Sequence, residues 1–307
     1  MLSTSATLPS PLEPVDDPLL ERAGVTLRLK RDDLIHPLVP GNKWRKLLPN
    51  LRAARAAGHR RLLTFGGAYS HHLTATAAAA RAAGLASVGL VRGDELADRP
   101  RNPALAAAER DGMELAFLSR AAYRATLRAL DAPATRRRLE QRFGRAHVLP
   151  EGGSNALAAR GAAGTVEELP DLGAGDVVCC PVGSGGTLAG IAAALPPGAR
   201  ALGVAVLRGG AGYLESEVAA LHRAGWGAAP AFPRWAIDHD HHGGGYGRIP
   251  PELAAFTDRF ERDHGLRLER RYVAKALRCL YHRAERGAFP PGTRLTLVVT
   301  GPPGVCD

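Results

Sequence analysis

The stretch Cys180-Pro-Val-Gly-Ser-Gly-Gly-Thr-Leu-Ala-Gly190 decides the fold. It follows the apolar run 176–180 and leads into an Ala-rich run at 188–195, which predicts a buried strand, a glycine-rich turn and a helix. Glycines let the backbone approach an anion closely, and the first amides of a helix point toward it. A dinucleotide fingerprint would need glycine at Leu188, and no Gly-Lys-Ser/Thr follows. The turn therefore predicts a phosphate site of another kind, with an ordinary strand-to-helix turn as the alternative.

Short apolar runs alternate with Ala-rich helical stretches along most of the chain. Such alternation is typical of α/β proteins with largely parallel sheets. Helices are expected from Trp44 to Gly58 and from Ser70 to Gly84, because each glycine suits a left-handed helix end. We further expect an exposed arginine-rich helix at 120–142 and a proline-rich surface strap at 8–18. Six buried strands are expected at 62–65, 87–91, 113–118, 176–180, 201–207 and 295–299.

The composition favours a globular protein without a nucleic-acid or membrane partner. The 307 residues are 45% hydrophobic, and 40 basic against 30 acidic residues give a net charge of +10. The basic residues are spread along the chain, often beside acids, which is weak evidence for a polyanion partner. No apolar run approaches the roughly 20 residues that span a bilayer, and residues 1–17 lack the features of a signal peptide. Cysteines at 179, 180, 279 and 306 have neither zinc-finger nor disulfide-scaffold spacing, so a cytoplasmic protein is expected.

A second glycine-rich turn, Phe65-Gly-Gly-Ala-Tyr-Ser-His-His72, also follows a strand and opens a helix, with Ser70 placed as N-cap. Two anion-receptive turns suit a ligand with a phosphate at one end and a carboxylate at the other, such as a phosphorylated cofactor holding an amino acid. The sequence has four lysines, and Lys43 begins a helix with Lys46 three residues later. The positive potential there should lower the pKa of Lys43 and favour Schiff-base chemistry. A surface lysine is the alternative.

Six motifs in order resemble the pyridoxal-phosphate enzymes of fold type II, which are tryptophan synthase beta-like. Within that group they are most similar to the 1-aminocyclopropane-1-carboxylate deaminase/D-cysteine desulfhydrase family. The similarity runs from about Leu29 to Gly304. The motifs are PGNKWRKL, TFGGAYSHH, PEGGSNALAARG, CPVGSGGTLAG, GGGYGRIPPEL and RRYVAKAL.

The resemblance implies an α/β fold with two open, mostly parallel sheets and the cofactor between two domains. The large domain would comprise 1–46 and 151–307, and the small one 47–150. Lys43 would form the internal aldimine and move protons at the substrate α-carbon. Ser70 would lie at the substrate carboxylate or assist proton transfer. The other positions carried over are two active-site tyrosines, a phosphate loop and a hydroxyl at the pyridine nitrogen: Tyr246, Tyr272, Gly183, Ser184, Gly185, Gly186, Thr187 and Thr300. The turn 151–155 is assigned to the cleft wall, with a structural turn as the alternative.

Three positions depart from the family pattern. His71 stands where the family has the asparagine that donates to the cofactor's phenolic oxygen, a role that an imidazole N–H could fill. Val273 replaces a glutamate typical of the deaminases. Pro302-Pro303 follows Thr300-Gly301 in place of a second glycine and removes two backbone donors. Because Val273 and Thr300 are similar to the desulfhydrase branch, cyclopropane ring opening should be harder here than thiol loss.

The sequence therefore predicts a pyridoxal 5'-phosphate enzyme that performs β-elimination or deamination of a small amino acid, D-cysteine first. Deamination of 1-aminocyclopropane-1-carboxylate is the alternative, and a catalytically impaired homologue acting as a regulatory binding module is a third possibility. A homodimer is expected from the family. The run Asp238-His-Asp-His-His242 offers metal-ligand types, but neighbours on one loop rarely close a site, so we expect a cleft-rim role and no metal.

Overall fold

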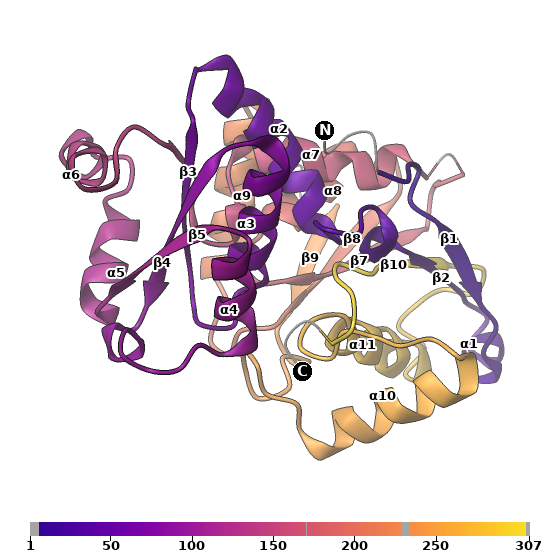
Figure 1. Cartoon of the computed structure of the whole chain (residues 1–307). Coiled ribbons are helices and arrows are strands. Elements are labelled where there is room, and N and C mark those ends of the chain that lie inside the picture. Colours follow the sequence, from indigo (N-terminus) through magenta and orange to yellow (C-terminus); the bar gives the residue numbers. More distant parts are fainter. Residues whose placement is uncertain (1–5, 170, 229–233, 305–307) are drawn as a thin grey trace.

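The computed structural model describes residues 6–169, 171–228 and 234–304; Cys306 lies outside them. It contains two sheets flanked by helices, and Figure 1 shows the smaller sheet and its helices beside the larger. The α/β fold class is confirmed. No described helix is long and apolar enough to cross a membrane.

The larger sheet has six strands, and all neighbouring strands pair in parallel except β1 (Leu12–Val15) and β2 (Thr26–Lys30). These edge strands are antiparallel, with Leu12 opposite Lys30. The proline-rich segment predicted as a strap therefore supplies an edge strand, and proline is tolerated at a sheet edge. In spatial order the strands are β1 (Leu12–Val15), β2 (Thr26–Lys30), β10 (Arg294–Val298), β7 (Val177–Val182), β8 (Arg200–Ala205) and β9 (Trp235–Asp238).

The smaller sheet has four parallel strands. All its strands come from within the predicted small domain, and those of the larger sheet from outside it, although the domain bounds themselves stay a prediction. In spatial order they are β5 (Met113–Leu118), β4 (Ala86–Arg92), β3 (Arg61–Gly66) and β6 (His147–Val148).

Helices cover both faces of each sheet. The predicted strands are confirmed within one or two residues, and so are the helices that end before Gly58 and Gly84. The predicted burial is wrong for β5, because it lies at the sheet edge and is buried only at Met113. The predicted arginine-rich helix is wrong as one element, because Pro133 begins a second helix there. The helices are α1 (Pro18–Arg22), α2 (Asn42–Ala56), α3 (His71–Ala83), α4 (Pro103–Arg110), α5 (Arg120–Arg128), α6 (Pro133–Phe143), α7 (Ala156–Glu167), α8 (Gly186–Ala194), α9 (Tyr213–Trp226), α10 (Pro251–His264) and α11 (Val273–Glu285), with short 3-10 turns at Asp32–Leu34, Asp94–Leu96 and Glu151–Gly153.

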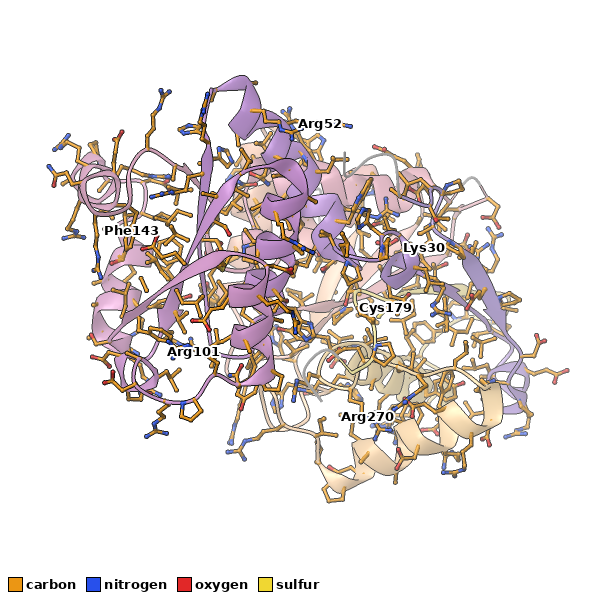
Figure 2. All side chains as sticks on the ribbon, viewed as in Figure 1. Lys30, Arg52, Arg101, Phe143, Cys179 and Arg270 are labelled. Atoms are coloured by element: carbon orange, nitrogen blue, oxygen red, sulfur yellow. The ribbon has the colours of Figure 1, made fainter. Side chains whose placement is uncertain are left out.

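Separate apolar clusters hold these layers together. Strands β2, β7, β8 and β10 pack on α1, α10 and α11 through one face of the large sheet. Strands β7, β8, β9 and β10 pack on α7, α8 and α9 through the other face. Figure 2 shows Lys30 and Cys179 in this half and Arg101 and Phe143 in the other. Helix α2 packs through Trp44, Leu47 and Leu51 on α3. Helices α2 and α3 therefore carry both Lys43 and Ser70 to the region between the sheets (Figure 1).

Candidate active site

The turn before Lys43 is anchored to the end of β10. Gly41 has a φ of +71°, and a Cβ there would lie 2.0 Å from the carbonyl oxygen of Thr300, so only glycine fits. The amide of Asn42 donates to that same carbonyl at 3.1 Å, and its side-chain Nδ2 donates to Thr187 Oγ1 at 3.0 Å. The lysine turn, the buried Thr300 and the glycine-rich loop after β7 are therefore brought together as predicted.

Burial lowers the pKa of Lys43 to about 8. The direction agrees with the sequence prediction, but the cause differs, because removal from water accounts for the shift. Burial and then the charge of Lys43 hold the pKa of Lys46 well below its usual value, with burial the larger cause. The charge of one lysine therefore acts on the other in the opposite sense to the prediction, because Lys43 lowers the pKa of Lys46. Lys43 therefore offers a neutral amine at a far lower pH than an exposed lysine does.

A cation and hydroxyl groups converge beside the glycine-rich loop. Lys46 Nζ donates to Ser154 Oγ at 2.9 Å and to the carbonyl of Gly152 at 3.3 Å. Ser154 Oγ lies 2.7 Å from Ser184 Oγ. A Cβ on Gly186, where α8 begins, would lie 2.6 Å from Ser154 Oγ and 3.0 Å from Lys46 Nζ. Glycine at this point lets the Lys46 amine and the serine hydroxyls approach the helix N-terminus, and all of these groups favour an anion.

Sequence reasoning missed two contributors to this cradle. Lys46 was considered only for its effect on Lys43, although a spacing of three residues puts both on one side of α2. Ser154 was assigned with its turn to the cleft wall. Its contact with Ser184 joins segments 30 residues apart in sequence, which no local pattern predicts.

The second glycine-rich turn has the predicted form. Ser70 is the N-cap of α3 and its Oγ accepts from the amide of Leu73 at 3.4 Å. A Cβ on Gly66 would come within 2.7 Å of Ser70 Oγ, so the turn closes tightly over the cap. His71 follows as the first residue of α3, with its ring centroid 6.2 Å from that of Tyr272. The helix N-terminus and Ser70 thus face the same region as His71.

His72 is a buried structural neighbour of the site. Its Nε2 lies 2.7 Å from Thr64 Oγ1, and this hydroxyl donates onward to the carbonyl of Leu149 at 3.2 Å. His72 therefore donates from Nε2 and is neutral. Burial and the charges of Lys43 and Lys46 hold its pKa well below the usual value, in agreement with that tautomer.

The two predicted tyrosines meet at the start of α11. Their ring centroids lie 5.8 Å apart at 75°, with Tyr272 packed near Gly183 of the phosphate loop. Tyr246 is 42% exposed and its Oη donates to the carbonyl of Tyr69 at 3.4 Å, which spans the two sheet-bearing halves. Burial raises the pKa of Tyr272 well above its usual value. Tyr272 is therefore a neutral phenol, able to donate or accept.

A buried carboxylate is present here, but not at the deaminase position. Val273 is fully buried in the core. Glu269 accepts from the backbone amides of Arg271, Tyr272 and Val273 at 2.7, 2.7 and 3.1 Å, which fixes the first turn of α11. Its visible task is to position Tyr272.

The Asp-His-Asp-His-His run is tied into this half of the molecule. Asp238 accepts from His241 Nδ1 at 2.7 Å and from Arg283 at 2.8 Å, and His239 Nε2 lies 2.7 Å from Glu215. Ligand atoms of Asp238, His241 and Cys279 lie within 4.8 Å of one another. Because the Arg283 guanidinium already binds the carboxylate, we assign this group to holding the loop.

Comparisons with known proteins agree with this geometry. Residues 4–301 match the family described as pyridoxal-phosphate dependent enzyme. A D-cysteine desulfhydrase of Klebsiella pneumoniae is 31% identical over an alignment of 310 residues. The alignment covers 95% of this chain and 91% of that protein. A Thermotoga maritima protein provisionally named 1-aminocyclopropane-1-carboxylate deaminase is 36% identical over 180 residues, 58% of this chain and 56% of that protein.

The fold is also similar to that of solved structures. A crystal structure described as an ACC deaminase homologue superposes with a TM-score of 0.80 at 24% identity, over 97% of this chain and 90% of that one. The family match extends over nearly the whole chain and includes the lysine turn, both glycine-rich turns and both tyrosines. The chain belongs to the family of pyridoxal-phosphate-dependent enzymes.

Proposed function

We propose that this enzyme converts D-cysteine and water to pyruvate, sulfide and ammonia. The observation that carries the proposal is the cradle of Lys46, Ser154 and Ser184 at the N-terminus of α8, one helical turn from the low-pKa amine of Lys43. Groups suited to a phosphate and a nucleophilic amine thereby meet on adjacent turns of α2. The D-cysteine desulfhydrase of Klebsiella pneumoniae supports the choice of substrate.

The residues present fit pyridoxal phosphate. A dianionic phosphate would accept from Lys46, the serine hydroxyls and the first amides of α8, and a Cβ on Gly186 would obstruct it. When bound, the cofactor withdraws electrons from the substrate α-carbon, which makes its proton removable. Lys43 is the one lysine whose position after the Gly41 turn and whose pKa of about 8 suit covalent attachment and proton movement at that carbon.

The remaining assignments follow from position. Ser70 and the N-terminus of α3 would hold the substrate carboxylate, because both favour an anion. Tyr272, a neutral phenol beside Gly183, would lie at the reacting carbon, and Tyr246 would cover it from the ring of Tyr272 to the Tyr69 carbonyl of the other half. Both tyrosines would exclude water from the site.

The polar ends of the cofactor would meet Thr300, which matches the family, and His71, which departs from it. Thr300, joined through its carbonyl to the Asn42 amide, would offer a hydroxyl to the pyridine nitrogen. His71 would donate to the phenolic oxygen. With Val273 in place of a carboxylate, the ring nitrogen would stay unprotonated, which favours loss of a good leaving group such as a thiol over cyclopropane ring opening.

We also propose the division into domains 1–46 with 151–307 and 47–150, a homodimer and a cytoplasmic location. The sheet memberships support the first, and the family resemblance supports the second. The third is supported by the buried free thiols of Cys179, Cys180 and Cys279.

The test combines spectroscopy with product analysis. Purified wild type and Lys43→Ala are incubated with pyridoxal phosphate, and the visible spectrum is recorded before and after D-cysteine is added. We expect an absorption band of lysine-bound cofactor in wild type alone, perturbed by D-cysteine, with sulfide and pyruvate released in equal amounts. Lys43→Ala should lose turnover.

Other outcomes contradict the assignment in distinct ways. Release of 2-oxobutyrate from 1-aminocyclopropane-1-carboxylate without sulfide from D-cysteine would make the chain a deaminase. Cofactor binding without turnover of a panel of D- and L-amino acids would make it a binding module. Turnover by Lys43→Ala at the wild-type rate would overturn the catalytic role of the lysine.

A further inference from the structure

A buried lysine without a role so far lies one helical turn after Tyr272. Lys275 of α11 is fully buried, and its Nζ donates to the carbonyl oxygen of Gly245 at 2.9 Å. Gly245 immediately precedes Tyr246, the residue that packs against Tyr272. One helix therefore carries a site tyrosine and also holds the backbone beside the other.

The loop bound by Lys275 contains three consecutive glycines. Gly243, Gly244 and Gly245 all have positive φ values, of 60°, 84° and 119°. A Cβ on Gly243 would lie 3.2 Å from Lys275 Cε, so the chain runs closely around the lysine stem. Three consecutive glycines have great conformational freedom, and each loses more entropy on ordering than any other residue. Bonds from the amides of Gly244 and Gly245 to His242 order the loop from inside, and the contact with Lys275 orders it from outside.

Contacts from α11 hold the loop at both ends. At its start, Asp238 accepts from Arg283 at 2.8 Å, and His241 Nε2 lies 2.8 Å from His282 Nδ1. At its end, Lys275 contacts Gly243 and bonds to Gly245. Of these contacts from α11, the bond from Lys275 lies nearest in sequence to Tyr246. The Gly245 carbonyl also accepts from the Arg248 amide at 3.2 Å, so loss of Lys275 should loosen the tyrosine while the start of the loop stays in place.

A buried ammonium at Lys275 lowers the stability of the folded state. Burial lowers the pKa of Lys275 to about 8, against the opposing effect of Glu269. A methionine of similar length would fill the same space without that cost. The placement is therefore better explained by the bond that the ammonium makes than by packing.

The geometry points to Lys275 as a positioning residue that sets Tyr246 against Tyr272 and against the Tyr69 carbonyl across the cleft. This inference deepens the proposed function and rests on it. Lys275 acts through the Gly245 carbonyl, and it touches neither substrate nor cofactor in this role.

A double-mutant cycle on the holoenzyme tests the coupling. With the amino acid that wild type turns over, Lys275→Met should lower kcat/KM about 20-fold while cofactor affinity changes by less than about threefold. In a Tyr246→Ala background the same substitution should change kcat/KM by less than about threefold, because the tyrosine to be positioned is gone. Equal effects of Lys275→Met in both backgrounds would overturn the inference.

Amide hydrogen exchange gives a readout that does not need turnover. Peptides covering 239–249 should exchange faster in Lys275→Met than in wild type, with α8 and the phosphate loop unchanged. Lys30→Met is the matched control, because Lys30 is equally buried on β2 and bonds to Ser10 and Glu168 instead. Unchanged exchange in Lys275→Met, or equal acceleration by Lys30→Met, would contradict the role of Lys275. If wild type turns over no amino acid, the proposed function fails while this exchange result still decides the loop contact.

Discussion

Arg45 and Lys46 are neighbours on α2, but their buried charges meet opposite surroundings. Arg45 forms ion pairs at 2.8 Å with Asp32 and with Glu168, and Lys30 joins the same glutamate at 2.8 Å. Lys46 meets hydroxyl and carbonyl oxygens, and no carboxylate of residues 6–169, 171–228 or 234–304 pairs with it. Successive helix residues point about 100° apart, which is how one helix serves both groups.

The group around Arg45 stabilises the fold, whereas the group around Lys46 is suited to binding a ligand. The Asp32–Arg45–Glu168–Lys30 group is hereafter called the paired network. Its members bond to one another and to Ser10 and Thr165, and they tie β2, α2 and the end of α7 together. The Lys46 cradle leaves a buried amine with no acidic partner among the described residues, and a bound anion would favour its charged form. Substitutions in the first should therefore affect stability, and substitutions in the second should affect cofactor binding.

The largest effect is expected from breaking the paired network with Glu168→Gln. Two buried cations would lose their shared carboxylate, and the free energy of unfolding at pH 7 should fall by about 3 kcal/mol. Urea unfolding measures it, and the cofactor affinity of the folded variant should equal that of wild type. A loss below about 1 kcal/mol would show that the network is not the structural anchor described.

The same carboxylate gives that stability a pH dependence. Bonds from Arg45 and Lys30 outweigh burial and hold the pKa of Glu168 at about 2, below its ordinary 4.5. The unfolded state thus binds the proton first, so the stabilisation is complete above about pH 4.5 and is lost as pH falls toward 2. The difference in unfolding free energy between wild type and Glu168→Gln should shrink across that window.

The next effect should appear when the unpaired cation is removed by Lys46→Met. Loss of charge-assisted bonds to a phosphate should weaken pyridoxal phosphate binding about 100-fold, equivalent to about 2.7 kcal/mol. The apoprotein should be as stable as wild type or more so, because a buried ammonium is gone. Lys30→Met should show the reverse, with lower stability and unchanged cofactor affinity. Equal cofactor binding by wild type and Lys46→Met would remove Lys46 from the cradle.

These two surroundings could be predicted from sequence only in part. The glycine-rich turns, Ser70 as N-cap and the first-turn position of Lys43 follow from local rules, because glycine and capping residues act over a few positions. The partners of Lys46 could not, since Ser154 lies 108 residues away. The same holds for the paired network, where Lys30 meets Glu168 across 138 residues.

The missed strands have a similar explanation. Strand β2, Thr26–Lys30, alternates apolar and polar residues over five positions, too few for a firm periodicity. The structure explains why this strand carries two basic residues. Lys30 is buried within the paired network, and Arg28 bonds to Asp171 at 2.6 Å. Charge at these positions concealed a strand that parallel pairing with β10 stabilises.

The smallest effect is a shift along the pH axis. With a pKa of about 8, roughly a tenth of Lys43 is neutral at pH 7, against well under a thousandth of an ordinary lysine. The rate of covalent cofactor attachment to apoprotein, followed by absorbance, should rise with pH and level off above about pH 8. A rate still rising tenfold per pH unit at pH 9.5 would show an unperturbed amine.

The central claim, that Lys43 is the amine that binds the cofactor, is tested most directly by borohydride reduction of the holoenzyme and mass mapping of the labelled peptide. The chain has four lysines, so the outcome is discrete. We predict a single pyridoxyl-phosphate label on Lys43, with Lys30, Lys46 and Lys275 unmodified. A label on Lys46 or Lys275, or none on Lys43, would contradict the account.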